Sequence, residues 1–102
     1  MIRNKEDILL SIKKHQNKIE SFGVKRLGLF GSYVRNEHNL QSDIDILVEF
    51  FQDRKTFDNF IHLSFLLEDI LKHHIELVTT ESLSPYIKPH ILKEVEYVIP
   101  GN

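Results

Sequence analysis

Two aspartates, Asp43 and Asp45, stand two positions apart at the start of an apolar run. If that run is a β-strand, both side chains leave the same face, about 6.6–7 Å apart along the chain. Two such carboxylates repel each other and must be solvated, hydrogen-bonded or bound to a cation. Oxygen ligands suit Mg²⁺, which usually takes one or two carboxylates and completes its coordination with waters and substrate phosphates. The pair therefore predicts a magnesium site, and the alternative is a solvated strand start that caps a turn.

A glycine and a serine, Gly31 and Ser32, end an earlier segment whose alternating pattern predicts a strand over 24–30. Glycine lets a phosphate approach the backbone closely. A serine that begins a short helix offers its N–H and its hydroxyl to an anion, although it can equally be a simple helix cap. An anion site at one strand end beside a carboxylate pair on the next indicates a nucleoside triphosphate held through Mg²⁺.

Arg35 follows Ser32 by three residues, which would place it on the same side of a short helix if one forms there. It has two interpretations that the sequence does not separate. In one, its guanidinium contacts phosphate. In the other, it is a surface arginine paired with Glu37 or Asp45.

The elements that must position these residues can be read from hydrophobic spacing. Helical periodicity predicts a helix over 4–21 and a main core helix over about 56–72. Strands are predicted over 43–50 and 75–79, and a last helix over about 89–96. The stripe expected to face the core on the main helix comprises Phe57, Phe60, Ile61, Phe65, Leu67 and Leu71.

This order of elements predicts a single α/β (α+β) domain over residues 1–102, with a small mixed sheet of three to four strands flanked by helices. The absence of cysteine excludes disulfide scaffolds, thiol catalysis and cysteine-based zinc sites. A formal net charge of -2 argues against a protein that coats nucleic acid. No secretory signal and no membrane-spanning run is visible, so we expect a cytoplasmic location without membrane contact.

The Gly-Ser pair, ten intervening residues and then Asp-x-Asp together resemble the signature of the nucleotidyltransferase superfamily related to DNA polymerase beta. The short form, with Arg35, Glu37 and the run Ser-Asp-Ile-Asp-Ile-Leu-Val, resembles the minimal nucleotidyltransferases, abbreviated MNT. The predicted third strand and the tail 87–95 look like this family too. The resemblance covers about residues 20–99 and implies a nucleotidyltransferase fold of the polymerase beta-like palm type.

The resemblance implies a role for each matching residue. Asp43 and Asp45 would hold two Mg²⁺ ions, and Gly31 and Ser32 would bind the distal phosphates of ATP. Glu76, on the predicted third strand, would complete the metal site and take the proton of the acceptor hydroxyl. An in-line displacement at the α-phosphorus would then release pyrophosphate.

The resemblance also implies a partner. Short MNT proteins neutralise HEPN-domain toxins, which are helical ribonucleases, and the characterised type transfers AMP from ATP to tyrosine hydroxyls of the toxin. A catalytic fold that fills 102 residues leaves no room for an acceptor-binding domain. We therefore expect a Mg²⁺-dependent protein adenylyltransferase that acts as an antitoxin.

Two other hypotheses remain open. The chain departs from the usual family pattern at Val34, Asn36 and Glu76, where small residues and an aspartate are more common. These departures favour a binding module that neutralises the toxin by complex formation with an idle site. A small-molecule nucleotidyltransferase, acting for example on an aminoglycoside, is weaker because it would need a homodimer to form the acceptor cleft.

Overall fold

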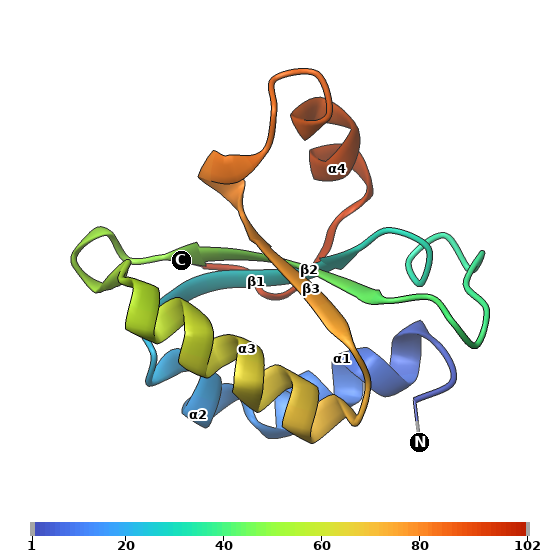
Figure 1. Ribbon diagram of the computed structural model, residues 1–102, viewed down its shortest axis with the longest axis horizontal. Helices are drawn as coiled ribbons and strands as arrows, with labels where there is room; N and C mark the ends of the chain where they lie inside the picture. The colour runs from blue at the N-terminus through green and yellow to red at the C-terminus, as the bar shows by residue number, and fades with distance from the viewer. Residues whose placement is uncertain (1, 102) are drawn as a thin grey trace.

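The computed structural model describes residues 2–101, which form a four-stranded mixed sheet with the strand order β3-β2-β1-β4 (Figure 1). The central strands β1 and β2 are antiparallel, β4 is antiparallel to β1, and β3 is parallel to β2. The α/β class and the mixed sheet predicted from the sequence are confirmed. The strands are β1 (Val24–Phe30), β2 (Ile44–Phe50), β3 (Ile75–Thr79) and β4 (Glu96–Ile99).

Three helices cover one face of the sheet, and a fourth helix lies over the other face (Figure 1). The covering layer consists of α1 (Lys5–Lys14), α2 (Gln16–Glu20) and α3 (Phe57–Leu71), and the isolated helix is α4 (Lys88–Glu94). Two short 3-10 turns, Gln52–Arg54 and Thr80–Ser82, follow β2 and β3. The two faces therefore have very different environments.

The first predicted helix is divided into two. His15 leaves the helical region with φ -110° and ψ 19°, and its backbone N–H donates to Ile12 O at 3.0 Å. The prediction of one continuous helix over 4–21 is therefore wrong. The break at His15 still leaves the predicted apolar residues Ile8, Ile12 and Ile19 fully buried.

The main helix α3 has the predicted limits, but its buried face differs from the predicted one. Leu63, Leu67 and Leu71 are buried, whereas Phe57 and Phe65 are 76% and 63% exposed. The three leucines recur every four residues and the two phenylalanines are eight residues apart, so the helix carries two apolar rows and only one of them can face the sheet. The prediction that both phenylalanines belong to the core is wrong.

The last predicted helix is shorter than expected. It ends at Glu94, Val95 is extended with ψ 135°, and the chain continues as β4 from Glu96. The prediction of a helix as far as Glu96 is wrong because the following residues pair with β1 instead, for example Tyr97 with Gly28. Pairing of this kind satisfies backbone N–H and C=O groups that an edge strand would otherwise leave to water.

The hydrophobic core lies between the sheet and the covering helices. It is built from aliphatic residues of α1, α2, β1, β2 and α3, together with Tyr33, Phe50, Ile75 and Ile99. None of the helices in the described part of the chain combines the length and apolar character that a bilayer crossing needs.

Candidate active site

The strand pair β2–β3 brings two of the predicted carboxylates side by side. Asp45 and Glu76 are register partners in these parallel strands, which run about 4.7–4.9 Å apart. The neighbours of Asp45 on β2, Ile44 and Ile46, are buried in the core under the helices. Because side chains alternate along a strand, Asp45 and Glu76 project from the opposite face, and Asp43 precedes β2 on that side.

Asp45 is the carboxyl group most affected by its surroundings. Burial first, and then the negative charges of Glu76 and Asp43, raise the pKa of Asp45 from 3.8 to about 6. The positive charge of Arg35 acts in the opposite direction. A raised pKa means that ionising Asp45 costs free energy, as expected where several carboxylates lie close together, partly shielded from water and with too little positive charge nearby. A bound cation would lower that cost.

The turn after β1 packs directly against Asp45. Gly31 has φ 82°, and a Cβ built on it would collide with the Asp45 carboxylate. Its carbonyl accepts hydrogen bonds from the N–H groups of Val34 and Arg35 at 3.1 and 3.2 Å. Glycine is therefore required here both for backbone conformation and for the close approach of the carboxylate.

The segment that starts at Ser32 is a hydrogen-bonded turn over 32–36 and not a short helix. Glu37 N–H donates to Ser32 O at 2.9 Å, and Asn36 adopts φ 58°, a left-handed conformation that ends the helical direction of the chain. The turn still presents Ser32 beside Gly31, but no helix dipole adds to the anion site.

Arg35 holds two carboxylates. Its Nε donates to Glu37 at 2.9 Å, and its Nη1 donates to both oxygens of Glu94 at 2.9 and 3.1 Å. The hydrogen bond to Glu37, followed by that to Glu94, raises the pKa of the guanidinium. The expected pairing with Glu37 is confirmed, while the second partner is Glu94 and not Asp45.

Glu94 is a residue of this region that sequence reasoning missed. The second oxygen of its carboxylate also accepts a hydrogen bond from Gly31 N–H at 2.7 Å. Glu94 comes from α4 and is 63 positions away from Gly31 in the chain, so no local sequence pattern predicts the contact. It joins the turn, Arg35 and α4 into one network.

Two histidines support the start of β2. His73 Nε2 donates to Ser42 O at 2.7 Å, and His74 Nδ1 contacts Asp43 Oδ1 at 3.0 Å. Both follow α3, so the end of that helix fixes the strand that carries the two aspartates.

The donor set in this region consists of oxygen atoms, which matches Mg²⁺ in kind. Within residues 2–101, no group of three or more histidine, cysteine, aspartate or glutamate side chains is arranged to hold a metal ion by itself. Mg²⁺ usually takes one or two carboxylates and fills its other positions with waters and phosphates. The carboxylates fit such a shared site and do not fit a cage made only of protein ligands.

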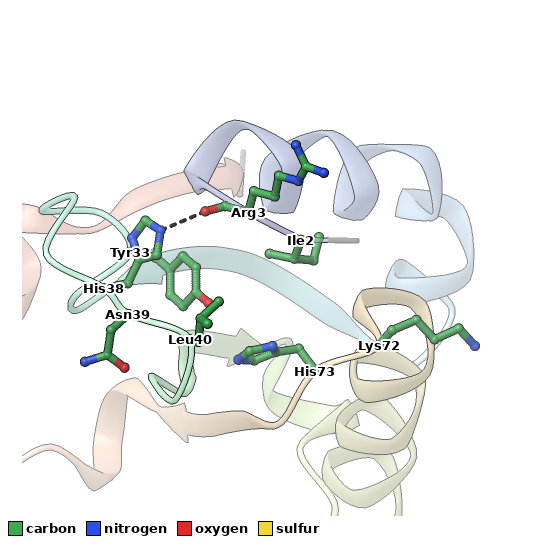
Figure 2. Close-up of a pocket in the computed structure, with 8 residues that line it drawn as sticks. All are labelled: Ile2, Arg3, Tyr33, His38, Asn39, Leu40, Lys72 and His73. Atoms are coloured by element: carbon green, nitrogen blue, oxygen red, sulfur yellow. Dashed lines mark hydrogen bonds between the residues drawn. The ribbon is translucent and has the colours of Figure 1, made fainter.

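A cavity of about 760 Å³ lies on another side of the 31–43 loop (Figure 2). Its wall includes Tyr33, which is 3% exposed and stacks on His38 with ring centroids 4.1 Å apart. His38 Nε2 donates to Arg3 O at 2.7 Å, the contact drawn in Figure 2. None of the predicted site residues lines this cavity. Its aromatic wall instead anchors the loop that carries the Gly31 turn.

Comparison with known proteins identifies the family. The nucleotidyltransferase domain family matches residues 10–98. The protein adenylyltransferase MntA of Thermococcus cleftensis is 43% identical over 93 residues, which cover 91% of this chain and 91% of the relative. A Methanocaldococcus jannaschii protein assigned as a protein adenylyltransferase is 43% identical over 77 residues, covering 76% of this chain and 82% of the relative.

Solved structures share the same fold. A protein assigned as a minimal nucleotidyltransferase superposes with a TM-score of 0.71 at 28% identity, covering 86% of this chain and 93% of its own. A chain of the Shewanella oneidensis complex of a tri-AMPylated HEPN toxin with an MNT antitoxin superposes with a TM-score of 0.63 at 21% identity. That match covers 91% of this chain and 72% of the other and shows the fold alone. The resemblance found in the sequence is thus confirmed, and the chain belongs to the nucleotidyltransferase family of enzymes as one of its minimal members.

Proposed function

We propose that this minimal nucleotidyltransferase is an antitoxin that transfers AMP from ATP to a tyrosine hydroxyl of a HEPN-domain toxin. The observation that carries the proposal is the pairing of Asp45 with Glu76 across β2 and β3, directly beside the Gly31 turn. Sequence similarity to a protein adenylyltransferase over most of the chain supports the reaction. The proposal places the reaction in the cytoplasm, without a membrane or a nucleic acid as partner.

The phosphates are assigned to the turn after β1. Gly31 permits close backbone approach, Ser32 stands beside it, and Arg35 has a guanidinium whose fork geometry matches phosphate oxygens. These groups bind and orient the triphosphate so that its α-phosphorus lies over the carboxylates. Orientation of this kind supplies a large part of catalysis in phosphoryl-transfer enzymes.

The metal is assigned to Asp43, Asp45 and Glu76, which would hold two Mg²⁺ ions together with the phosphates. Bound Mg²⁺ would neutralise charge on the attacking and leaving oxygens of an in-line displacement. The raised pKa of Asp45, caused first by burial and then by neighbouring carboxylates, supports this assignment because the site lacks compensating positive charge.

Glu76 is assigned the proton of the acceptor hydroxyl. Its side chain is exposed, and β3 is an edge strand of the sheet. A tyrosine presented by another protein therefore reaches Glu76 without any movement of the core. A carboxylate within hydrogen-bond reach of a hydroxyl is suited to accept its proton.

The test is transfer of label. The wild-type protein is incubated with ATP labelled at the α-phosphate, Mg²⁺ and the HEPN-domain toxin proposed as its partner, and label on the toxin is measured. We expect transfer by the wild type and loss of transfer in Asp43→Asn/Asp45→Asn. Glu49→Gln, on the same strand and face but paired with Arg26, is the matched control and should retain transfer. Absence of label with the wild type, or label that survives in the double variant, would contradict the proposal.

A second candidate is a binding module that neutralises the toxin by complex formation with an idle site. The exposed apolar row of α3, which includes Phe57 and Phe65, favours a protein partner irrespective of catalysis. Protection of cells from the toxin by Asp43→Asn/Asp45→Asn, equal to protection by the wild type, would support this candidate. Loss of protection would exclude it.

A further inference from the structure

The Glu94 network occupies the groups that the proposed function assigns to phosphate. Its carboxylate accepts from Gly31 N–H at 2.7 Å and from Arg35 Nη1 at 2.9 and 3.1 Å. A carboxylate on a glycine N–H and a guanidinium has the same charge-assisted contacts that a phosphate would make there. A phosphate oxygen that bound these two donors would therefore have to replace the Glu94 carboxylate.

These contacts cannot all be shared with a ligand. Gly31 has a single N–H, and its hydrogen bond goes to Glu94. Arg35 has five N–H groups, and those committed to Glu37 and Glu94 leave others free for a ligand. The conflict with a phosphate is therefore sharpest at Gly31.

The charges of the site add to the conflict. Glu94 is close enough to Asp45 that its negative charge contributes to raising the pKa of Asp45. A triphosphate would enter a region that already holds Asp43, Asp45 and Glu76 as well as Glu94. Repulsion among these anions favours the departure of Glu94 when the triphosphate arrives.

The helix that carries Glu94 is weakly held. Of the seven residues of α4, only Ile91 is buried. Ile91 is also outside the main core cluster, which lies on the other face of the sheet. A change of the Glu94 rotamer, or a small shift of α4, therefore disturbs little of the packing that stabilises the fold.

We propose that Glu94 is a built-in competitor of the nucleotide, which holds Gly31 N–H and Arg35 in the absence of ligand and is displaced by the triphosphate. The inference rests on the proposed function, since it needs a triphosphate at the Gly31 turn. It assigns to Glu94 the role of a residue that sets nucleotide affinity by competition and not by contact with the substrate.

The test is calorimetric titration of the folded protein with ATP and Mg²⁺, using wild type, Glu94→Ala and Glu94→Gln. We expect Glu94→Ala to bind ATP about tenfold more tightly, the lower end of the contribution of one charge-assisted hydrogen bond. Glu94→Gln should change affinity in the same direction by less, because its amide oxygen still accepts from Gly31 N–H. Glu94→Gln keeps the side-chain shape and decides the test if the alanine variant does not fold.

Glu37→Gln is the matched control, since Glu37 also pairs with Arg35 but does not contact Gly31 N–H. It should change affinity by less than about threefold, as expected for an exposed ion pair. Nucleotide binding that is unchanged or weaker in both Glu94 variants would overturn this inference and leave the proposed function intact. Absence of binding by the wild type and every variant would overturn both.

Discussion

The two faces of the sheet are built from the same strands but have different roles. One face packs against the hydrophobic core, and the other carries the candidate active site. On the face covered by α1, α2 and α3, β2 contributes Ile44, Ile46 and Val48, all fully buried. On the other face, the same strand contributes Asp45, Leu47 and Glu49, and the short helix α4 and the segment that leads to it lie above (Figure 1). Burial of apolar side chains on the first face stabilises the folded state, whereas the second face holds carboxylates that repel one another.

The difference teaches that stability and chemistry are separated by the two-residue period of the strand. A residue two positions away stays on the same face, and a residue one position away changes face. Substitutions on the covered face should therefore lower stability. Substitutions among the carboxylates should lower activity but reduce the electrostatic repulsion within the folded state.

The largest expected loss of stability is on the covered face, at Leu67. Leu67→Ala leaves a cavity at a fully buried position and should lower the free energy of unfolding by about 2–5 kcal/mol. The matched variant is Phe65→Ala, two residues away on the same helix but 63% exposed, which should cost less than about 1 kcal/mol. Urea denaturation of both proteins measures the difference. A larger loss for Phe65→Ala would show that the assignment of faces on α3 is wrong.

A smaller loss is expected where the open face meets the turn, at Gly31. Gly31→Ala forces a left-handed conformation on a residue with a side chain and should cost about 1–2 kcal/mol. Gly23→Ala, with φ 85°, is matched for backbone strain but is outside the site. Both should be destabilised in urea, while only Gly31→Ala should also lose AMP transfer, because its Cβ displaces the Asp45 carboxylate. Equal activity of the two variants would argue against a role for the turn.

The smallest effect is a gain of stability at Asp45, and its sign depends on pH. Folding raises the pKa of Asp45 from 3.8 to about 6, so the folded state binds this proton more tightly than the unfolded state. That contribution to stability is fully present below pH 3.8 and is lost as the pH rises through about 6. Asp45→Asn carries no titratable group at this position, so its stability does not fall over this pH range for this reason. Without Mg²⁺, we expect the thermal midpoint of Asp45→Asn to exceed that of the wild type at about pH 7.5 and to match it at about pH 4.

Asp53→Asn controls for the loss of one negative charge, since Asp53 lies on the exposed 3-10 turn after β2. A thermal midpoint of Asp45→Asn below that of the wild type at about pH 7.5 would contradict the account. So would an equal rise in Asp53→Asn.

Much of the fold was predictable because the strands obey strict alternation. Residues 24–30 and 75–79 form the strands that their patterns predict, and β2 begins at Ile44, one residue later than expected. The phenylalanines of α3 were misassigned because a helix with two apolar rows does not reveal which row faces the sheet. β4 was missed because its pairing with β1 depends on contacts distant in sequence.

The site was predictable as far as its parts are close in sequence. The Gly31 turn and the Asp43/Asp45 pair are separated by a short loop, and their spacing carries the family resemblance. Glu94 and His74 were not foreseen, since each reaches the site from an element whose position depends on tertiary packing. Their roles follow only from distances across the folded chain.

The most direct test of the separation between the two faces is to measure two properties of Asp45→Asn in parallel. These are the rate of AMP transfer to the HEPN-domain toxin proposed as partner and the thermal unfolding midpoint at about pH 7.5. The account predicts a rate at least about a hundredfold below that of the wild type, together with a higher midpoint. A rate close to that of the wild type, or a loss of rate accompanied by a lower midpoint, would contradict it.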